Sequence, residues 1–272
     1  VPVWTGQPLA GQSILLLSEQ GFGDTIQFAR YAQELNRGGA TVRLLAPESL
    51  VEILAAMPGI EQVVSSIADA PSCDWQAPLL SLPALHNGDI PSKVPYLFPD
   101  PDRIEYWTSV LQAPQGHLRV GIAWRGGPDH RNDRNRSIDP ALLRALANVH
   151  ATTFISLQKG QPHGLPDLPF APLHRDLTDF ADTAALMFHL DLVISVDTSV
   201  AHLAGALGRR TWVLLPFNPD WRWMLNREDS PWYPGMRLFR QKQRGKWLPV
   251  MDRVRHELSA LAKQNPVSVP GR

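Results

Sequence analysis

Cysteine is nearly absent from this chain of 272 residues, in which Cys73 is the one thiol. A single thiol cannot build a disulfide framework within the chain or supply a cysteine-based zinc site. Long apolar runs are also missing, since stretches such as 14–17 and 212–215 are far shorter than the ~18 residues that a membrane-spanning helix needs. No secretory signal opens the sequence, so we expect a cytoplasmic protein without a membrane span.

An excess of charge of either sign is missing as well. The 26 Lys and Arg residues balance 26 Asp and Glu residues, which gives a formal net charge of zero. This balance argues against a protein that coats nucleic acid or a membrane surface, and no basic groove with interleaved aromatics suggests a nucleic-acid partner. The 44% of hydrophobic residues is enough for a real core. Because the chain starts at Val1 rather than Met, we expect that an upstream segment has been removed.

Short apolar strands alternate with helices along most of the chain. The predicted strands are 13–17, 41–46, 62–65, 78–82, 119–124, 152–157, 192–196 and 211–215. Apolar residues at helical spacing predict helices at 24–36, 48–57, 140–149, 180–190 and 199–207. Strands joined by helical crossovers have to be parallel, so this alternation predicts an α/β fold with open parallel sheets.

A proline-rich connector interrupts the alternation at 82–115, with room for one helix near 103–111. We therefore predict two α/β domains, 1–112 and 113–250, followed by a C-terminal helix and tail in 251–272. Open α/β sheets bind ligands beyond the carboxyl ends of their strands. In both halves the informative residues come directly after predicted strands.

The first strand leads into a glycine turn that ends at an acid. Gly21 and Gly23 permit a sharp turn and a close approach to a ligand, and Asp24 opens the following helix. The turn lacks the third glycine of a dinucleotide fingerprint and the Gly-Lys-Ser/Thr of a phosphate loop. Asp24 has two interpretations, which are a helix cap and a general base that points into a cleft.

Two later loops offer cations at the edge of the second sheet. The loop 125–137 is rich in arginine and includes Arg136, and Gln158 and Lys159 follow the next strand. Most charged loops are solvated surface. These two leave the carboxyl ends of strands, where anions bind, and arginine suits bidentate phosphate contact.

The most informative segment follows the strand 192–196 with Asp197, Thr198 and Ser199, which open a helix that ends at Gly208. Thr198 or Ser199 is expected to cap that helix, whose first N–H groups form a phosphate site. His202 lies one turn in and is more typical of a packed residue than of a catalyst. No second histidine stands three or four residues away to form a metal pair.

These motifs together resemble the heptosyltransferase-like glycosyltransferases of family 9, in the bacterial branch that often follows tetratricopeptide repeats. The resemblance runs from Trp4 to about Arg240. It is carried by the motifs EQGFGDTIQFARY at 19–31, LSLP at 80–83, RNRS at 134–137, SLQKG at 156–160 and DTSVAHLAGA at 197–206.

The resemblance implies the GT-B fold, with two facing Rossmann-like domains and a cleft between them. It implies transfer of a sugar from a nucleotide-diphosphate sugar to a hydroxyl acceptor without a metal or other cofactor, the acceptor being a glycan, a lipid-linked sugar or a protein. Asp24 takes the position of the catalytic base, supported by Gly21 and Gly23. The donor-binding positions are Arg136, Gln158, Lys159, Asp197, Thr198, Ser199 and His202. The first half is shorter than in heptosyltransferases, so the family's acceptor site is the part of the resemblance that can least be carried over to this chain.

Two other interpretations remain open. One is a nucleotide-sugar epimerase or hydrolase with the same architecture, and the other is a catalytically degenerate module that binds a sugar nucleotide or a glycan. The leading hypothesis requires that Asp24 look across a gap at the Thr198–Ser199 helix start, with closure of the two halves bringing base and donor together.

Overall fold

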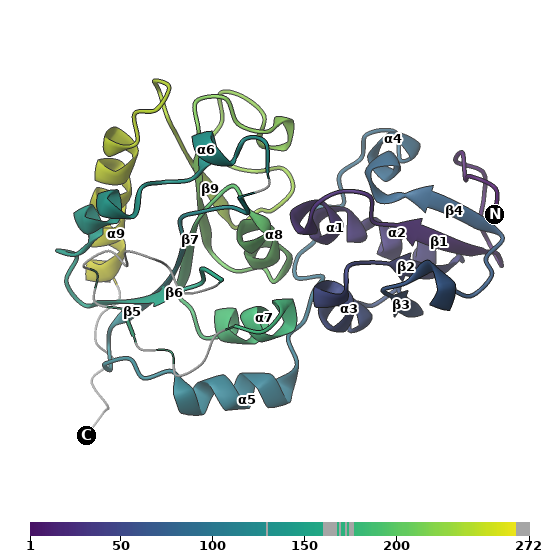
Figure 1. Cartoon of the computed structure of the whole chain (residues 1–272), viewed down its shortest axis with the longest axis horizontal. Helices are drawn as coiled ribbons and strands as arrows, with labels where there is room; N and C mark the ends of the chain where they lie inside the picture. The colour runs from purple at the N-terminus through teal and green to yellow at the C-terminus, as the bar shows by residue number, and fades with distance from the viewer. Residues whose placement is uncertain (129, 160–167, 169, 172, 174–176, 265–272) are drawn as a thin grey trace.

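The computed structural model describes residues 1–128, 130–159, 168, 170–171, 173 and 177–264, which form two parallel sheets side by side (Figure 1). The first sheet has the order β3-β2-β1-β4 and the second the order β6-β5-β7-β8-β9. All pairings within both sheets are parallel. The predicted α/β class with parallel sheets is therefore confirmed.

The first sheet is formed by β1 (Ser13–Leu17), β2 (Thr41–Leu45), β3 (Gln62–Val64) and β4 (Trp75–Pro78). Its helices are α1 (Phe22–Ala29), α2 (Tyr31–Arg37), α3 (Glu48–Ala55) and α4 (Leu82–Leu85), with 3-10 turns η1 (Ile67–Asp69) and η2 (Leu79–Ser81). The predicted helix 24–36 is thus two helices that meet at Arg30.

The second sheet is formed by β5 (Leu118–Ala123), β6 (Thr152–Ser156), β7 (Leu192–Val196), β8 (Thr211–Leu215) and β9 (Met236–Arg240). Its helices are α5 (Pro101–Val110), α6 (Asp133–Arg136), α7 (Phe180–Phe188), α8 (Ser199–Ala206) and α9 (Leu248–Gln264), with 3-10 segments η3 (Pro140–Leu146) and η4 (Trp221–Trp223). The predicted helix 140–149 is the 3-10 segment η3. The end of α8 is as predicted, because Gly208 has a φ of +68° in the C′ position.

Two strand predictions need correction. The predicted strand 78–82 is wrong, since β4 ends at Pro78 and the apolar run behind it forms η2 and α4. Pro78 has the φ of −62° that a proline ring imposes, and the chain turns there into the 3-10 conformation. The edge strand β9 was not predicted, because two arginines interrupt the apolar residues of Met236–Arg240.

The second sheet has a different layer on each face. α9 and η3 pack on one face, where Leu143, Val254 and Leu258 join the core. α7 and α8 cover the other face, which is turned toward the first half (Figure 1). Residues behind β5, β6 and β7 share a cavity with α1 and α3, and Arg222 behind β8 pairs with Asp24 of α1.

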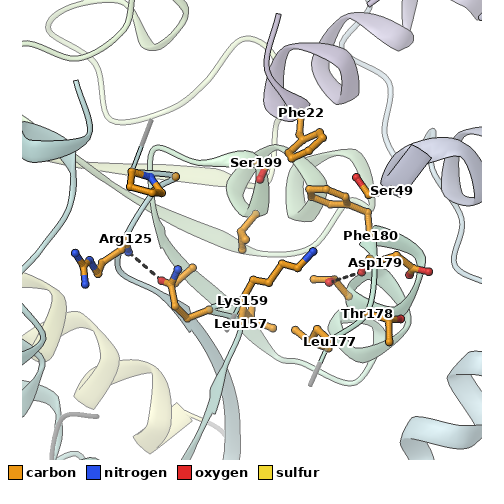
Figure 2. Close-up of a pocket in the computed structure, with 17 residues that line it drawn as sticks. Phe22, Ser49, Arg125, Leu157, Lys159, Leu177, Thr178, Asp179, Phe180 and Ser199 are labelled. Atoms are coloured by element: carbon orange, nitrogen blue, oxygen red, sulfur yellow. Dashed lines mark hydrogen bonds between the residues drawn. The ribbon is translucent and has the colours of Figure 1, made fainter. Parts of the chain in front are cut away.

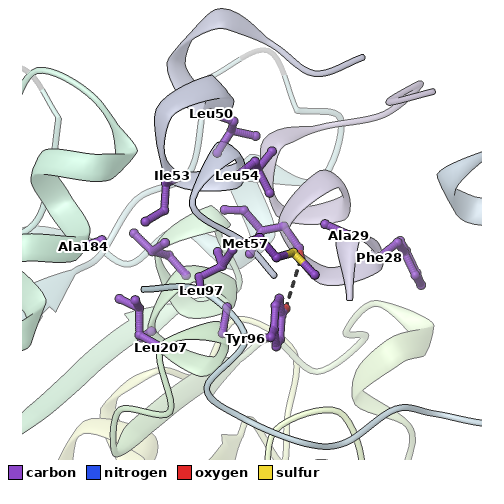
Figure 3. Packing of buried hydrophobic residues seen from close by; sticks show 14 of the residues in the cluster. Phe28, Ala29, Leu50, Ile53, Leu54, Met57, Tyr96, Leu97, Ala184 and Leu207 are labelled. Atoms are coloured by element: carbon purple, nitrogen blue, oxygen red, sulfur yellow. Dashed lines mark hydrogen bonds between the residues drawn. The ribbon is translucent and has the colours of Figure 1, made fainter. Parts of the chain in front are cut away.

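One hydrophobic cluster runs through both halves without a break. Phe28 and Leu54 of the first half share it with Ala184 of α7 and Leu207 behind α8 (Figure 3). The connector adds Tyr96, whose hydroxyl donates to Ile26 O at 3.0 Å. The two halves are consequently joined by buried apolar contacts.

The helix α5 precedes β5 in the chain but lies along α7 (Figure 1). Trp107 Nε1 donates to Asp182 Oδ1 at 2.9 Å, and His189 Nε2 lies 3.0 Å from Ile104 O. Asp100 caps α5 by accepting from Arg103 N at 3.0 Å, as expected of a helix start. The domain boundary at 112 and 113 stays a prediction.

Candidate functional site

A cavity of about 360 Å³ lies between the two halves, within the size range of small-molecule sites (Figure 2). The first half contributes Phe22 of α1 and Ser49 of α3. The second half contributes residues of loops and of helix starts, including Arg125, Gly126, Gly127, Gln158, Lys159, Asp179, Phe180 and Ser199.

Three of the predicted donor-binding residues meet in this cavity, namely Gln158, Lys159 and Ser199. Lys159 extends its ammonium group into the space (Figure 2). Gln158 Oε1 accepts from Arg125 N at 3.1 Å, which ties the loops behind β5 and β6 together. Ser199 is the first residue of α8, so free N–H groups of a helix start adjoin the cavity.

The other predicted donor-binding residues do not line this cavity. Thr198 is the N-cap residue of α8, but its side chain caps nothing, and its hydroxyl lies 3.1 Å from Ser195 Oγ. Arg136 Nη1 donates to Asp197 O at 2.8 Å, so this guanidinium binds the backbone directly behind β7. The side chains of Asp197, Thr198 and His202 are buried at the start of α8.

His202 is a packed residue. Its Nδ1 lies 3.0 Å from the Tyr233 hydroxyl, its ring stacks on Trp223, and its Nε2 lies 4.0 Å from Asp197 Oδ1. Burial, with the nearby charges of Arg222 and two other arginines, lowers the pKa of His202 well below 6.5. Burial also raises the pKa of Asp197, against the opposing effects of a hydrogen bond from Trp223 and of the charge of Arg222. The imidazole is therefore neutral at physiological pH.

Asp24 lies in the first turn of α1, next to Gly23, which contacts His202. It is not the N-cap, which is Gly21. As the third residue of the helix it accepts Gly21 N on Oδ2 at 3.1 Å. Its other oxygen, Oδ1, accepts from Arg222 Nη2 in an ion pair between the halves. Asp24 is not among the residues that line the cavity, and its carboxylate is held in an ion pair with Arg222 that the sequence did not predict.

The close approach made possible by Gly23 is to His202. A Cβ added to Gly23 would lie 2.8 Å from His202 Cδ2, so α1 begins directly against α8. Neither Gly21 nor Gly23 has a positive φ. Gly23 therefore serves the contact between α1 and α8, and neither glycine is required for a backbone turn that only glycine could adopt.

We expect Gly23→Ala to destabilise the protein by about 1–3 kcal/mol, because the buried His202 ring has no room to move away from a new methyl group. Chemical denaturation followed by circular dichroism measures the change. Gly127→Ala is the matched control, since no atom lies within 4 Å of its added Cβ. A loss in the control as large as in Gly23→Ala would contradict the contact.

The sequence did not single out Arg222. It lies in the loop behind β8, pairs with Asp24 and with Asp220 (2.9 Å), and is 9% exposed. Within the described part of the chain, Arg222 Nε is a buried donor without an acceptor. Such orphan donors are uncommon in proteins and mark a place where a ligand oxygen would be stabilised.

The described residues contain no group of three or more His, Cys, Asp or Glu side chains placed to hold a metal ion. Among the same residues, no helix has the length and apolar character needed to cross a membrane. That the reaction needs no metal stays a prediction.

Known proteins resemble this chain in sequence and in fold. The family model of glycosyltransferase family 9 (heptosyltransferase) matches residues 177–214, which run from α7 through the Asp197–Ser199 turn to β8. Protein FlbA of Caulobacter vibrioides is 30% identical over 284 residues, a match that covers 92% of this chain and 47% of FlbA. The chain therefore spans about half the length of this relative.

Two solved structures share the fold over nearly their whole length. A family 9 glycosyl transferase from Veillonella parvula has a TM-score of 0.60 at 10% identity, with 95% of this chain and 98% of that one covered. The ADP-heptose LPS heptosyltransferase II of E. coli has a TM-score of 0.62 at 12% identity, with 93% and 99% covered. The chain has the GT-B fold of these enzymes.

Proposed function

We propose that this chain is a glycosyltransferase that moves a sugar from a nucleotide-diphosphate sugar to a hydroxyl acceptor. The observation that carries the proposal is the cavity between the halves, in which Lys159 and the start of α8 at Ser199 face the same space. A cation and a helix N-terminus both favour a bound diphosphate. ADP-heptose is the first donor to test, because the E. coli protein of the same fold uses it.

The aromatic residues of the cavity suit the rest of a nucleotide. Phe22 of α1 and Phe180 of α7 line it together, with ring centroids 5.2 Å apart. Flat apolar side chains with a few polar groups are typical of nucleotide-sized sites. In this proposal Lys159 and the α8 N–H groups stabilise the charge that grows on the diphosphate as it leaves.

Asp24 is the proposed base. A carboxylate oxygen has two lone pairs, so each oxygen that already accepts from Gly21 or Arg222 can still accept a hydrogen bond from a substrate hydroxyl. The unpaired donor Arg222 Nε lies in the loop that reaches Asp24, where it can bind an oxygen atom of a reacting sugar. The proposed acceptor is unspecified.

The same ion pair favours a second candidate, a module that binds a nucleotide sugar without turnover. In the structure both Asp24 oxygens are already engaged, and the carboxylate does not line the cavity. Such a module would keep the affinity for the donor and lack transfer.

The first test is nucleotide binding by isothermal titration calorimetry with ADP and ADP-heptose. We expect Lys159→Gln to weaken binding about 10- to 100-fold, the value of one charge-assisted contact. Lys263→Gln removes an exposed lysine near the end of α9 and should leave affinity unchanged. Equal losses in both variants, or no binding of any of the ADP-, UDP- and GDP-sugars, would refute the proposed donor site.

Product analysis then separates the two candidates. Release of nucleotide that depends on an added hydroxyl acceptor supports the transferase, whereas tight donor binding with no release under any acceptor supports the binding module. Conversion of the sugar without an acceptor would instead indicate the epimerase or hydrolase.

A further inference from the structure

A second and larger cavity, of about 800 Å³, lies at the carboxyl edge of the second sheet. It is enclosed by the loops behind β5, β8 and β9, together with the start of η3. None of its lining residues is shared with the cavity between the halves. It is therefore a separate space, which is lined by the second half alone.

A buried side chain in its wall has an unused donor. Gln241 is 5% exposed, and its Oε1 accepts from Gly245 N at 3.0 Å and Phe217 N at 3.3 Å. These two N–H groups fix which end of the amide is the oxygen. Among the described residues, the Nε2 of Gln241 has no acceptor. A buried amide left in this way is costly unless an oxygen atom from a ligand or water completes it.

Cations surround the same space. Arg134 and Arg244 line it, both are exposed, and neither forms an ion pair within the part of the chain that the structure describes. The one carboxylate in the lining, Asp139, already accepts from Ala141 N at 2.9 Å as the cap of η3. The lining thus has an excess of positive charge, supplied by the residue type that best binds carboxylate and phosphate.

Neutral polar groups and one exposed ring complete the wall. Asn132, Asn135 and Asn218 line the cavity with amide groups, which can both donate to and accept from hydroxyls. Phe217 is 54% exposed beside them and presents an apolar face. Amides, an exposed ring and arginines in one cavity match a ligand with several hydroxyls and an anionic group.

We propose that this cavity binds an anionic sugar, that is, a carbohydrate that carries a carboxylate or a phosphate. Arg134 and Arg244 would hold the anionic group, and Gln241 Nε2 would donate to a sugar oxygen. The proposal does not depend on the proposed transferase activity, since it concerns a space with its own lining.

The test is isothermal titration calorimetry of the whole chain with trigalacturonic acid, with glucose 6-phosphate and with neutral maltotriose. We expect saturable binding of at least one of the two anionic probes, which also shows whether carboxylate or phosphate is preferred, and no binding of maltotriose. ADP at a saturating concentration should not displace the bound probe. No saturable binding of either anionic probe, equal binding of maltotriose, or displacement by ADP would overturn the proposal.

Three variants locate the binding. Arg134→Gln and Arg244→Gln should each weaken it about 10- to 100-fold, the value of a charge-assisted contact. Gln241→Glu keeps an oxygen for Gly245 N and Phe217 N but loses the donor, and it should abolish binding. Lys242→Gln is the matched control, because this exposed lysine lies next to Gln241 in sequence and lines a different cavity.

The variants at the exposed Arg134 and Arg244 keep the test decisive even if Gln241→Glu fails to fold. Thermal unfolding of each variant establishes that it is folded before titration. If Lys242→Gln weakens binding as much as Arg244→Gln does, the attraction is to general surface charge and the proposed site is wrong.

Discussion

Replacing Asp24 with asparagine is expected to reduce sugar transfer by about 100- to 10,000-fold while changing nucleotide affinity less than about threefold. A general base contributes a factor of this size, and asparagine cannot take a proton from a hydroxyl at neutral pH. Nucleotide affinity should persist because Asp24 does not line the cavity between the halves. Steady-state transfer rates and ADP titration of the same preparation measure both quantities.

Asp220→Asn is the matched control for Asp24→Asn. Asp220 pairs with the same Arg222 at 2.9 Å but lies in the second half, outside the proposed catalytic role. A loss of transfer in Asp220→Asn equal to that in Asp24→Asn would show that Asp24 acts only through the ion pair. A strong loss of ADP binding in Asp24→Asn would equally contradict its role as the base.

The second large effect is expected at Arg30, which lies between α1 and α2 and is 2% exposed. Its guanidinium donates to Pro91 O at 2.9 Å, to Trp232 O at 2.6 Å and to the Tyr96 hydroxyl at 3.1 Å. It thereby joins the first half, the connector and the second half. Arg30→Ala removes this donor set and opens a void, so we expect a loss of about 3–5 kcal/mol in the free energy of unfolding.

Urea denaturation measures this loss, with Arg37→Ala as the control. Arg37 belongs to α2, and its side chain is 64% exposed, so its removal should change stability by less than about 0.5 kcal/mol. Arg30→Lys should also destabilise the protein, because a single ammonium group cannot reach acceptors on three sides. If Arg30→Ala were as stable as Arg37→Ala, the buried hydrogen bonds of Arg30 would contribute nothing to the free energy of unfolding.

Strands buried on both faces were predicted best. β1, β7 and β8 have the predicted bounds, because uninterrupted leucine and β-branched runs there end at polar or glycine-containing turns. Two edge strands, β4 and β9, were predicted worst, whereas the edge strands β3 and β6 lie within one residue of their predicted bounds. β4 begins at Trp75 and Gln76, and β9 contains Arg237 and Arg240, since an edge strand tolerates polar side chains that hide its pattern.

The site was predictable only where its residues directly follow the carboxyl ends of predicted strands. Gln158, Lys159 and Ser199 follow buried strands, and the rule that ligands bind at strand ends was enough to place them together. The partner of Asp24 could not be found in this way, because Arg222 is 198 positions away and reaches Asp24 only through the contact between the halves. Gln241 gave no signal, since its unused donor depends on two backbone groups that its other end binds.

The hydrophobic cluster that runs through both halves restricts the motions by which substrates can bind and products can be released. Tyr96 N and Leu97 N both lie within hydrogen-bond distance of Ala206 O. The connector between the halves is therefore hydrogen-bonded to α8 and is also packed among apolar side chains. A hinge that swung the halves apart would have to expose this shared interior to water, at a cost comparable to partial unfolding. Exchange of nucleotide and product should therefore proceed by small displacements of the loops at the cavity mouth, with the two sheets moving as a single body.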